Sequence, residues 1–227
     1  MDELVTLARV ASPRGEVVLR RRGRSDDAVD ELIVNGTFAM DSSETSSERR
    51  LAQLVGTYGS EGRILVGGLG LGFTAAEILN AGVGRLVVVE LEGALVGWAR
   101  EGVTPTLARV ATDPRVHLVV ADVAVFLTGD HPDQPWDGIV LDVDNGPDFL
   151  IHEPNAGLYS SEVLTSAYDR LAPGGRLAIW CQGASPALLD TLRAIHLSAR
   201  ENVYQVTRGR RRFSYVIYTL DRPLAVG

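Results

Sequence analysis

The sequence predicts an α/β protein built on a mostly parallel sheet flanked by helices. After Gly62, short apolar runs alternate with amphipathic helical segments, which is the pattern of parallel strands joined by crossover helices. Two apolar segments near the end of the chain are separated by Arg208-Gly209-Arg210-Arg211 and predict a closing antiparallel hairpin. A Rossmann-like sheet with an antiparallel final hairpin is therefore expected.

The elements can be assigned in order from the position of these runs. The expected strands are 63–67, 85–90, 116–120, 137–142 and 175–181. The expected helices are 73–81, 92–102, 122–128, 160–171 and 185–198. The final hairpin is expected at 201–207 and 212–219. This ending favours a methyltransferase-type, seven-stranded sheet over the all-parallel dinucleotide-binding fold.

The first 45 residues predict a small β region ahead of the main domain. Val17-Val18-Leu19 and Leu32-Ile33-Val34 are short strands, and Asn35-Gly36 is the strongest two-residue hairpin signal. A polar linker follows at 42–47, and Ser47 is a candidate N-cap for a helix that begins at Glu48. We therefore expect a β region over 1–45 and a nucleoside-binding domain over 46–227.

Composition narrows the class of ligand and of environment. A net charge of −7 and a pI near 5.1 argue against a broad nucleic-acid surface and favour a small cationic substrate. The single cysteine, Cys181, cannot form an internal disulfide, and no stretch of 18 uninterrupted apolar residues is present. A cytoplasmic protein without a membrane segment is expected.

A glycine-rich loop follows the first strand of the main domain. Gly68, Gly70 and Gly72 come directly after Ile64-Leu65-Val66-Gly67 and open a helix at Phe73. Neither possible frame fits the dinucleotide fingerprint, and no lysine follows as a phosphate loop requires. The G-x-G-x-G spacing matches instead the loop of S-adenosylmethionine-dependent enzymes, although such a loop alone can be a tight packing turn.

Two acidic residues accompany this loop. Glu90 lies 18 residues beyond Gly72, at the end of an apolar strand, where a carboxylate can accept both ribose hydroxyls. Asp122 and Val123 follow the next strand, and Asp122 can accept a hydrogen bond from an adenine amino group while capping a helix. The alternative for Glu90 is an exposed carboxylate at the end of a strand.

The order and spacing of several segments resemble the spermidine synthase (polyamine aminopropyltransferase) family. The segments that carry the resemblance are Val66-Gly67-Gly68, Val89-Glu90-Leu91-Glu92, Asp113-Pro114-Arg115-Val116-His117, Ala121-Asp122, Trp136-Asp137-Gly138-Ile139-Val140-Leu141-Asp142, Leu171-Ala172-Pro173-Gly174-Gly175 and Cys181-Gln182-Gly183. Upstream, Leu32-Ile33-Val34-Asn35-Gly36 and then Glu48 are similar to the family's N-terminal β-domain and its lead into the first helix. The resemblance covers residues 30 to 185.

The resemblance implies aminopropyl transfer from decarboxylated S-adenosylmethionine to a polyamine, a homodimer, and the nucleoside contacts at Glu90 and Asp122. Asp142 would face the sulfonium and the incoming amine, and Gln182 could point into the same crevice. The family's loop Asp is absent at Gly70 and Leu71, and its second Asp is replaced by Asn145. Because an amide is no general base at neutral pH, the candidate substitutes are Asp144 and Asp148 in the following loop.

Two other functions stay open, and no metal is expected. Loss of both family Asp residues favours a methyltransferase using intact S-adenosylmethionine, and a catalytically weak nucleoside-binding protein is the third possibility. The four histidines, His117, His131, His152 and His196, show no metal-ligand spacing. Trp136 and Trp180 are assigned to the core.

Overall fold

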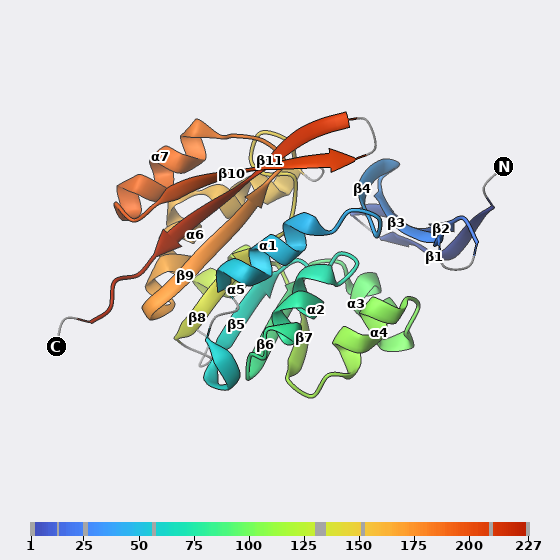
Figure 1. Cartoon of the computed structure of the whole chain (residues 1–227), viewed down its shortest axis with the longest axis horizontal. Helices are drawn as coiled ribbons and strands as arrows, with labels where there is room; N and C mark the ends of the chain where they lie inside the picture. The colour runs from blue at the N-terminus through green and yellow to red at the C-terminus, as the bar shows by residue number, and fades with distance from the viewer. Residues whose placement is uncertain are drawn as a thin grey trace.

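The computed structural model describes residues 3–12, 14–24, 27–55, 58–129, 135–150, 153–208 and 211–225. Its main sheet has seven strands in the order β10-β11-β9-β8-β5-β6-β7 (Figure 1). The strands are β5 (Arg63–Gly67), β6 (Arg85–Glu90), β7 (Val116–Val120), β8 (Trp136–Leu141), β9 (Leu171–Cys181), β10 (Arg200–Arg208) and β11 (Arg211–Asp221). Strands β5 to β9 are parallel, and β11 pairs antiparallel with β9 and with β10. The predicted α/β sheet with its closing hairpin is confirmed.

The order of the strands reverses around β5. Strands β6 and β7 extend the sheet on one side of β5, whereas β8 and β9 extend it on the other. The connection that follows β5 leads to one side of the sheet, and the connection that follows β8 leads to the other side. Because these two connections diverge, a crevice opens outside the carboxyl ends of β5 and β8. A ligand of this sheet is therefore expected beside Gly67 and Asp142.

Two hydrophobic clusters cover the two faces of the sheet. On one face lie α1 (Ser46–Val55), α2 (Phe73–Asn80), α3 (Gly93–Glu101) and α4 (Pro105–Thr112). On the other face lie α5 (Val123–Thr128), α6 (Ser161–Asp169) and α7 (Pro186–Ile195). Two short 3₁₀ segments lie in connections, η2 (Gly59–Glu61) before β5 and η3 (Glu153–Tyr159) before α6. Strand β5 shows the alternation, because Ile64 and Val66 belong to the first cluster and Leu65 to the second.

Several predicted boundaries are corrected. The helix expected at 92–102 ends at Glu101, and a second helix, α4, follows it with Thr104 as N-cap and a proline in its first turn. Strand β9 begins at Leu171, four residues before the predicted start, because Leu171 already pairs with Trp136 of β8, ahead of an irregularity in the register. The helices expected at 160–171 and 185–198 are shorter, at 161–169 and 186–195.

The prediction that Ser47 caps the first helix is wrong. Helix α1 begins at Ser46, and the backbone carbonyl of Thr45 accepts a hydrogen bond from the Arg49 N–H, which places the helix start two residues earlier. The Ser47 hydroxyl instead donates to a Glu48 carboxylate oxygen, 2.6 Å away.

The N-terminal β region is a four-stranded antiparallel sheet, larger than the hairpin that the sequence predicts. Its strands, in spatial order, are β1 (Leu4–Ser12), β2 (Gly15–Arg22), β3 (Val29–Val34) and β4 (Thr37–Asp41). The predicted turn at Asn35-Gly36 is confirmed, and both residues have positive φ, 52° and 75°, as a type I′ hairpin requires.

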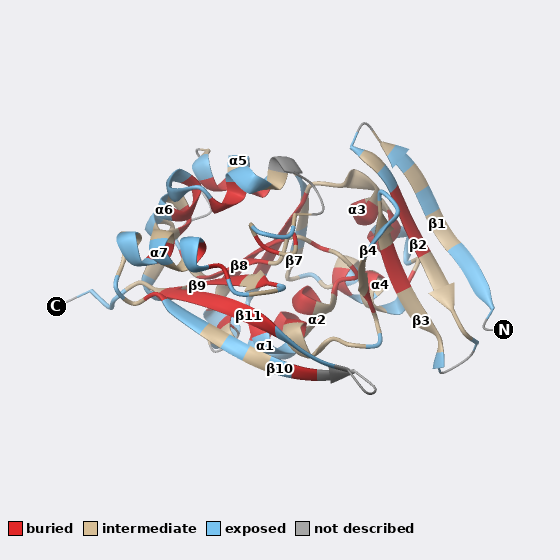
Figure 2. Cartoon of the chain, turned by 90° about the horizontal axis from the view of Figure 1, so that it is seen from above, coloured by how far each residue is buried: buried red, intermediate tan, exposed pale blue. Residues whose placement is uncertain are grey.

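This sheet packs against the main domain beside the glycine loop. Figure 2 shows it standing next to α3 and α4, with the buried parts of β2 and β3 in red. Val17, Leu19 and Leu32 are buried in the same cluster as Leu69 and Leu71 of the loop. The sheet thus forms a wall over the carboxyl edge of β5 and β6; whether 1–45 is a separate domain stays a prediction.

Candidate functional site

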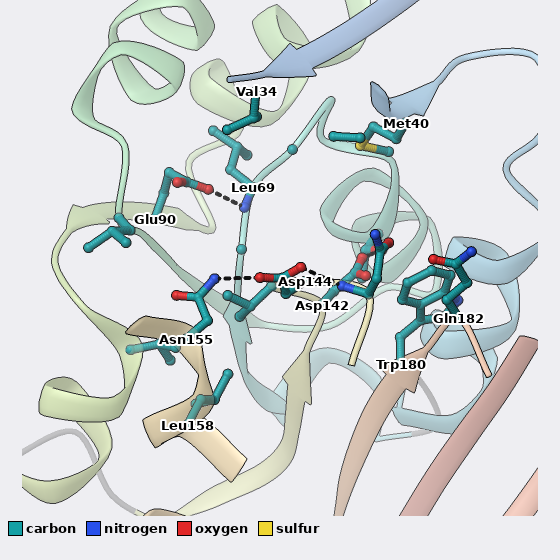
Figure 3. Close-up of a pocket in the computed structure, with 18 of the residues that line it drawn as sticks. Val34, Met40, Leu69, Glu90, Asp142, Asp144, Asn155, Leu158, Trp180 and Gln182 are labelled. Carbon is teal, nitrogen blue, oxygen red and sulfur yellow. Dashed lines mark hydrogen bonds between the residues drawn. The ribbon is translucent and has the colours of Figure 1, made fainter. Parts of the chain in front are cut away.

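A cavity of about 820 Å³ lies at the carboxyl ends of β5 to β9, under the N-terminal sheet. Nearly all of the predicted site residues line it: Gly68, Gly70, Glu90, Asp122, Val123, Asp142, Asp144, Asn145 and Gln182. Gly72 is the exception, because it precedes α2 and faces Leu107 and Val110 of α4. The structure thus brings residues from five strand ends, those of β5 to β9, to one place (Figure 3).

The first loop glycine is required by a close backbone contact. Gly68 has φ +94°, and a Cβ there would lie 2.1 Å from the carbonyl oxygen of Asp142. Its N–H donates to the carbonyl of Val89, 2.9 Å away. The loop is therefore held between the ends of β6 and β8, and only glycine fits at this position.

The N–H groups of the loop are largely used within the protein. That of Leu69 donates to the Glu90 carboxylate, and that of Leu71 lies 3.4 Å from the Met40 sulfur. A phosphate-binding loop needs these donors for its ligand. The geometry therefore suits a ligand that approaches the bare glycine backbone without phosphate groups, such as a nucleoside.

Glu90 is fixed at the end of β6. One carboxylate oxygen accepts from the Leu69 N–H and the other from the Glu92 N–H, both at 2.7 Å. Burial raises the pKa of Glu90 above its ordinary value, against the effect of these backbone hydrogen bonds. Each carboxylate oxygen can accept a further hydrogen bond, so a ribose diol can still be held from the cavity.

Asp122 and Val123 form the next part of the cavity wall. Asp122 caps α5, with one carboxylate oxygen 2.8 Å from the Ala124 N–H, and the residue is exposed. Val123 is buried, and its methyl groups lie about 3 Å from where a Cβ on Gly67 would be. The predicted combination of a helix cap and a cavity-facing carboxylate is present in the structure.

Asp142 lies where the chain leaves β8. It is half-buried, and one carboxylate oxygen accepts from the Thr74 hydroxyl of α2 at 2.7 Å. Burial raises the pKa of Asp142, and the Thr74 hydrogen bond opposes that rise. Thr74, which sequence reasoning did not identify, thus positions the carboxylate.

The Asp144 carboxylate is used to order the loop after β8. It is buried, with one oxygen 2.8 Å from the Asn145 N–H and the other 2.9 Å from the Asn155 side-chain amide (Figure 3). The Asn145 carbonyl in turn accepts from the Gln182 N–H at 2.9 Å, which joins this loop to the end of β9. Asn145 and Gln182 both line the cavity, and Gln182 is exposed.

Three further lining residues were missed or misplaced by sequence reasoning. Glu48 is buried, and burial together with nearby Asp142 raises its pKa to about 7. Met40 covers Gly70, its sulfur 2.7 Å from where a Cβ on that glycine would lie. Trp180 is partly buried, and it both packs against the first hydrophobic cluster and lines the cavity, whereas Trp136 is fully a core residue.

The cavity is strongly acidic. Its described lining carries nine carboxylate side chains against a single arginine, Arg14. The nine are Asp41, Glu44, Glu48, Glu90, Glu92, Asp122, Asp142, Asp144 and Glu162. Such a concentration of negative charge inside low-dielectric walls attracts cations.

Two further features concern metal ligands and membrane-spanning helices in the described part of the chain. Within it, no group of three or more His, Cys, Asp or Glu side chains is placed to hold a metal ion. His131 and His152 lie outside the described residues. No helix in the described ranges is long and apolar enough to cross a membrane.

Comparisons with known proteins identify relatives in sequence and in fold. A polyamine aminopropyltransferase of Mycobacterium tuberculosis is 34% identical over 177 residues, which cover 75% of this chain. The matched part is only 31% of that relative, so the chain spans less than a third of its length. No protein-family model matches the sequence.

Solved structures with the same fold include spermidine synthases. The spermidine synthase of Thermotoga maritima superposes with a TM-score of 0.73 over 95% of this chain and 72% of its own, at 18% identity. A spermidine synthase in complex with the transition-state analogue AdoDATO matches with the same score and identity and covers 95% of this chain and 73% of its own. At this identity the likeness shows the fold.

Proposed function

The chain belongs to the spermidine synthase-like family, and from this premise we propose that it transfers an aminopropyl group from decarboxylated S-adenosylmethionine to an amine of a polyamine. Its relatives in sequence are polyamine aminopropyltransferases, and its neighbours in fold are spermidine synthases, one of them bound to a transition-state analogue. Because the chain spans only part of those relatives, its donor and acceptor are proposals.

The observation that carries the proposal is the charge of the cavity. Nine carboxylates and one arginine line the described part of it, next to a glycine loop whose N–H groups are already used. Both proposed substrates are cations, since the donor has a sulfonium and an ammonium group and the acceptor has two or more ammonium groups. An acidic cavity binds both through charge-assisted hydrogen bonds.

The nucleoside half of the site is formed by the loop and two strand ends. We assign the ribose hydroxyls to Glu90, the adenine amino group to Asp122, and the apolar contact with the adenine ring to Val123. Because Gly68 has no side chain, the nucleoside can approach the edge of the sheet there. Gly70 follows in the same loop and also lines the cavity.

The acceptor half is assigned to the end of β8 and the segments beside it. Asp142 faces the reacting amine, with its orientation set by Thr74. Asn145 and Gln182 are proposed to contact the polyamine, and Asp144 orders the loop that carries Asn145. The reaction is an in-line displacement at a carbon activated by the sulfonium, so the protein has to orient the amine and accept its proton.

Isothermal titration with three ligands tests the proposal. We expect tighter binding of decarboxylated S-adenosylmethionine than of the intact form, binding of 5′-methylthioadenosine, and turnover when putrescine is added to the first. Equal affinity for both donors, with methyl transfer and no aminopropyl transfer, would contradict it. Binding of methylthioadenosine without any turnover would identify a nucleoside-binding protein.

One observation favours methyl transfer from intact S-adenosylmethionine as a second candidate. At Gly70 the loop carries no carboxylate, and the Met40 thioether fills the space above it. No negative charge at this point opposes the carboxylate of the intact donor. The same titration separates the two candidates.

The homodimer expected from the family resemblance stays a prediction, and multi-angle light scattering would test it.

A further inference from the structure

We propose that Glu48 is a second carboxylate of the acceptor half, which binds the reacting ammonium group together with Asp142 and accepts its proton. This inference rests on the proposed function and extends it to a residue outside the strand ends. Both residues line the same cavity, Glu48 from the first turn of α1 and Asp142 from the end of β8.

The position of Glu48 is unusual for an acidic residue in the first turn of a helix. Such residues are normally solvated while they interact with the helix dipole. Glu48 is only 7% exposed, because α1 packs against α2 and the sheet. Its side chain contributes to the cavity wall, so a ligand can reach a carboxylate that bulk water barely reaches.

No described arginine neutralises this pair of carboxylates. Glu48 accepts a hydrogen bond from the Ser47 hydroxyl, and Asp142 accepts one from Thr74. The arginines of α1 point elsewhere: Arg49 donates to Thr45, and Arg50 donates to Gln53 and lies over the Tyr204 ring.

The charges that face Glu48 from neighbouring elements are also negative. Asp142 at the end of β8 and Glu44 ahead of α1 both raise the pKa of Glu48, after burial, to about 7. Arg176 of β9 donates to the Leu54 carbonyl at the opposite end of α1 and pairs with Asp221. Burying carboxylates without a counter-charge is unfavourable, and a bound ammonium group removes that cost.

The other groups near Asp142 are less suited to accept a proton. Asn145 has an amide, which does not take up a proton at neutral pH. Asp144 has one carboxylate oxygen bound by the Asn145 N–H and the other by Asn155. Among these residues, Glu48 is therefore the carboxylate left to act with Asp142.

The chemical step balances with one proton transferred to this pair. The acceptor enters as R–NH₃⁺ and gives one proton to the Glu48–Asp142 pair, which leaves R–NH₂. The amine lone pair forms the N–C bond while the C–S bond breaks, and its electron pair leaves with sulfur as a neutral thioether. The product is a secondary ammonium ion, and the carboxylic acid then releases its proton to water.

The experiment compares wild type, Glu48→Gln and the control Glu101→Gln, an exposed residue at the end of α3 outside the cavity. Binding of putrescine and of spermidine is measured by calorimetry with saturating 5′-methylthioadenosine, from pH 6 to pH 9 and in two buffers of different ionisation enthalpy. Putrescine keeps nearly all of its protons from pH 6 to pH 8, so a change of its affinity in that interval reports on the protein.

We expect wild-type affinity for the amines to increase as the pH rises through about 7, with proton release on binding. Glu48→Gln should bind methylthioadenosine normally, bind the amines at least about tenfold more weakly, and lose the proton release. Glu101→Gln should match wild type. If Glu48→Gln does not fold, Glu48→Asp should keep the pH dependence at lower affinity.

Two outcomes would overturn the inference, and they are distinguishable. Unchanged amine affinity and proton release in Glu48→Gln would remove Glu48 from the site and leave the proposed function intact. If wild type binds methylthioadenosine but neither amine, the proposed acceptor class fails, and the role of Glu48 fails with it.

Discussion

Glu90 links the shape of the glycine loop to the affinity of the site. Its carboxylate binds the N–H groups of Leu69 and Glu92 and also faces the cavity. A ligand diol that adds hydrogen bonds to this carboxylate therefore binds to a group that is already oriented. Preorganisation of this kind lowers the entropy cost of binding.

Replacing Glu90 with Gln tests this dual role. The amide nitrogen cannot accept a hydrogen bond, so either the Leu69 or the Glu92 N–H loses its partner, and one ribose contact is lost as well. We expect the affinity for methylthioadenosine to fall about tenfold or more and the melting temperature to fall. Calorimetry and thermal unfolding would measure both, with Glu101→Gln as control. An unchanged affinity would place Glu90 outside the site.

Sequence reasoning at the residue scale works where a motif fixes the position of a side chain. The spacing of Glu90 from the loop and the cap position of Asp122 sufficed to place both at the cavity. Glu48 could not be found this way, because a Glu in the first turn of a helix is usually a solvated residue. Its burial depends on how α1 packs, which no local pattern records.

At the scale of elements, the contact between β4 and the glycine loop joins the two sheets. The Met40 sulfur lies over Gly70 and near the Leu71 N–H. On the other side of the N-terminal sheet, Ser12 donates to the Glu92 carboxylate at 3.0 Å and Arg14 to the Leu91 carbonyl at 2.9 Å. The small sheet is thus anchored to the segments that form the proposed nucleoside half of the site.

A pair of glycine substitutions measures this contact. Gly70→Ala adds a Cβ 2.7 Å from the Met40 sulfur at φ +50°, whereas Gly82→Ala adds one at φ +86° with nothing within 4 Å. Both should lose about 1 kcal/mol to backbone strain. Only Gly70→Ala should also weaken methylthioadenosine binding, and adding Met40→Ala should restore part of the loss. Chemical denaturation and calorimetry would show this; equal effects of the two alanines would contradict it.

The elements that sequence reasoning missed had weak or competing signals. Helix α4 follows α3 after three residues, and the Thr104-Pro105 start was present but was not recognised as a new helix. Strand β1 was missed because its residues are mostly exposed or half-buried, so it carries no clear apolar stripe. The buried strands β5, β6 and β8 were predicted well, since continuous apolar runs are typical of parallel strands.

In the whole molecule, buried carboxylates and carboxylates paired with arginine change the stability of the folded state in opposite directions as the pH changes. Burial raises the pKa of Glu48, Glu90 and Asp142, so the folded state holds their protons more tightly than the unfolded state. Their contribution to stability is present at low pH and is lost as the pH rises. Glu31 and Asp113 have lowered pKa values beside arginine, and their contribution is lost as the pH falls.

The unliganded protein should therefore be most stable in weakly acidic solution. The pKa of Glu48 rises from 4.5 to about 7, which corresponds to roughly 3 kcal/mol lost between those pH values. Glu48→Gln should flatten this decline and should be more stable than wild type at pH 8. Urea denaturation at several pH values would measure it; equal slopes for the two proteins would contradict it.

The N-terminal sheet also has a consequence for how the chain is made. Its buried residues Val17, Leu19 and Leu32 share a cluster with Leu69 and Leu95, which are translated later. Until those residues have left the ribosome, the apolar face of the N-terminal sheet is exposed to solvent and can associate with other nascent chains. This wall of the cavity is thus synthesised before the segments that support it, and its folding has to wait for the first half of the parallel sheet.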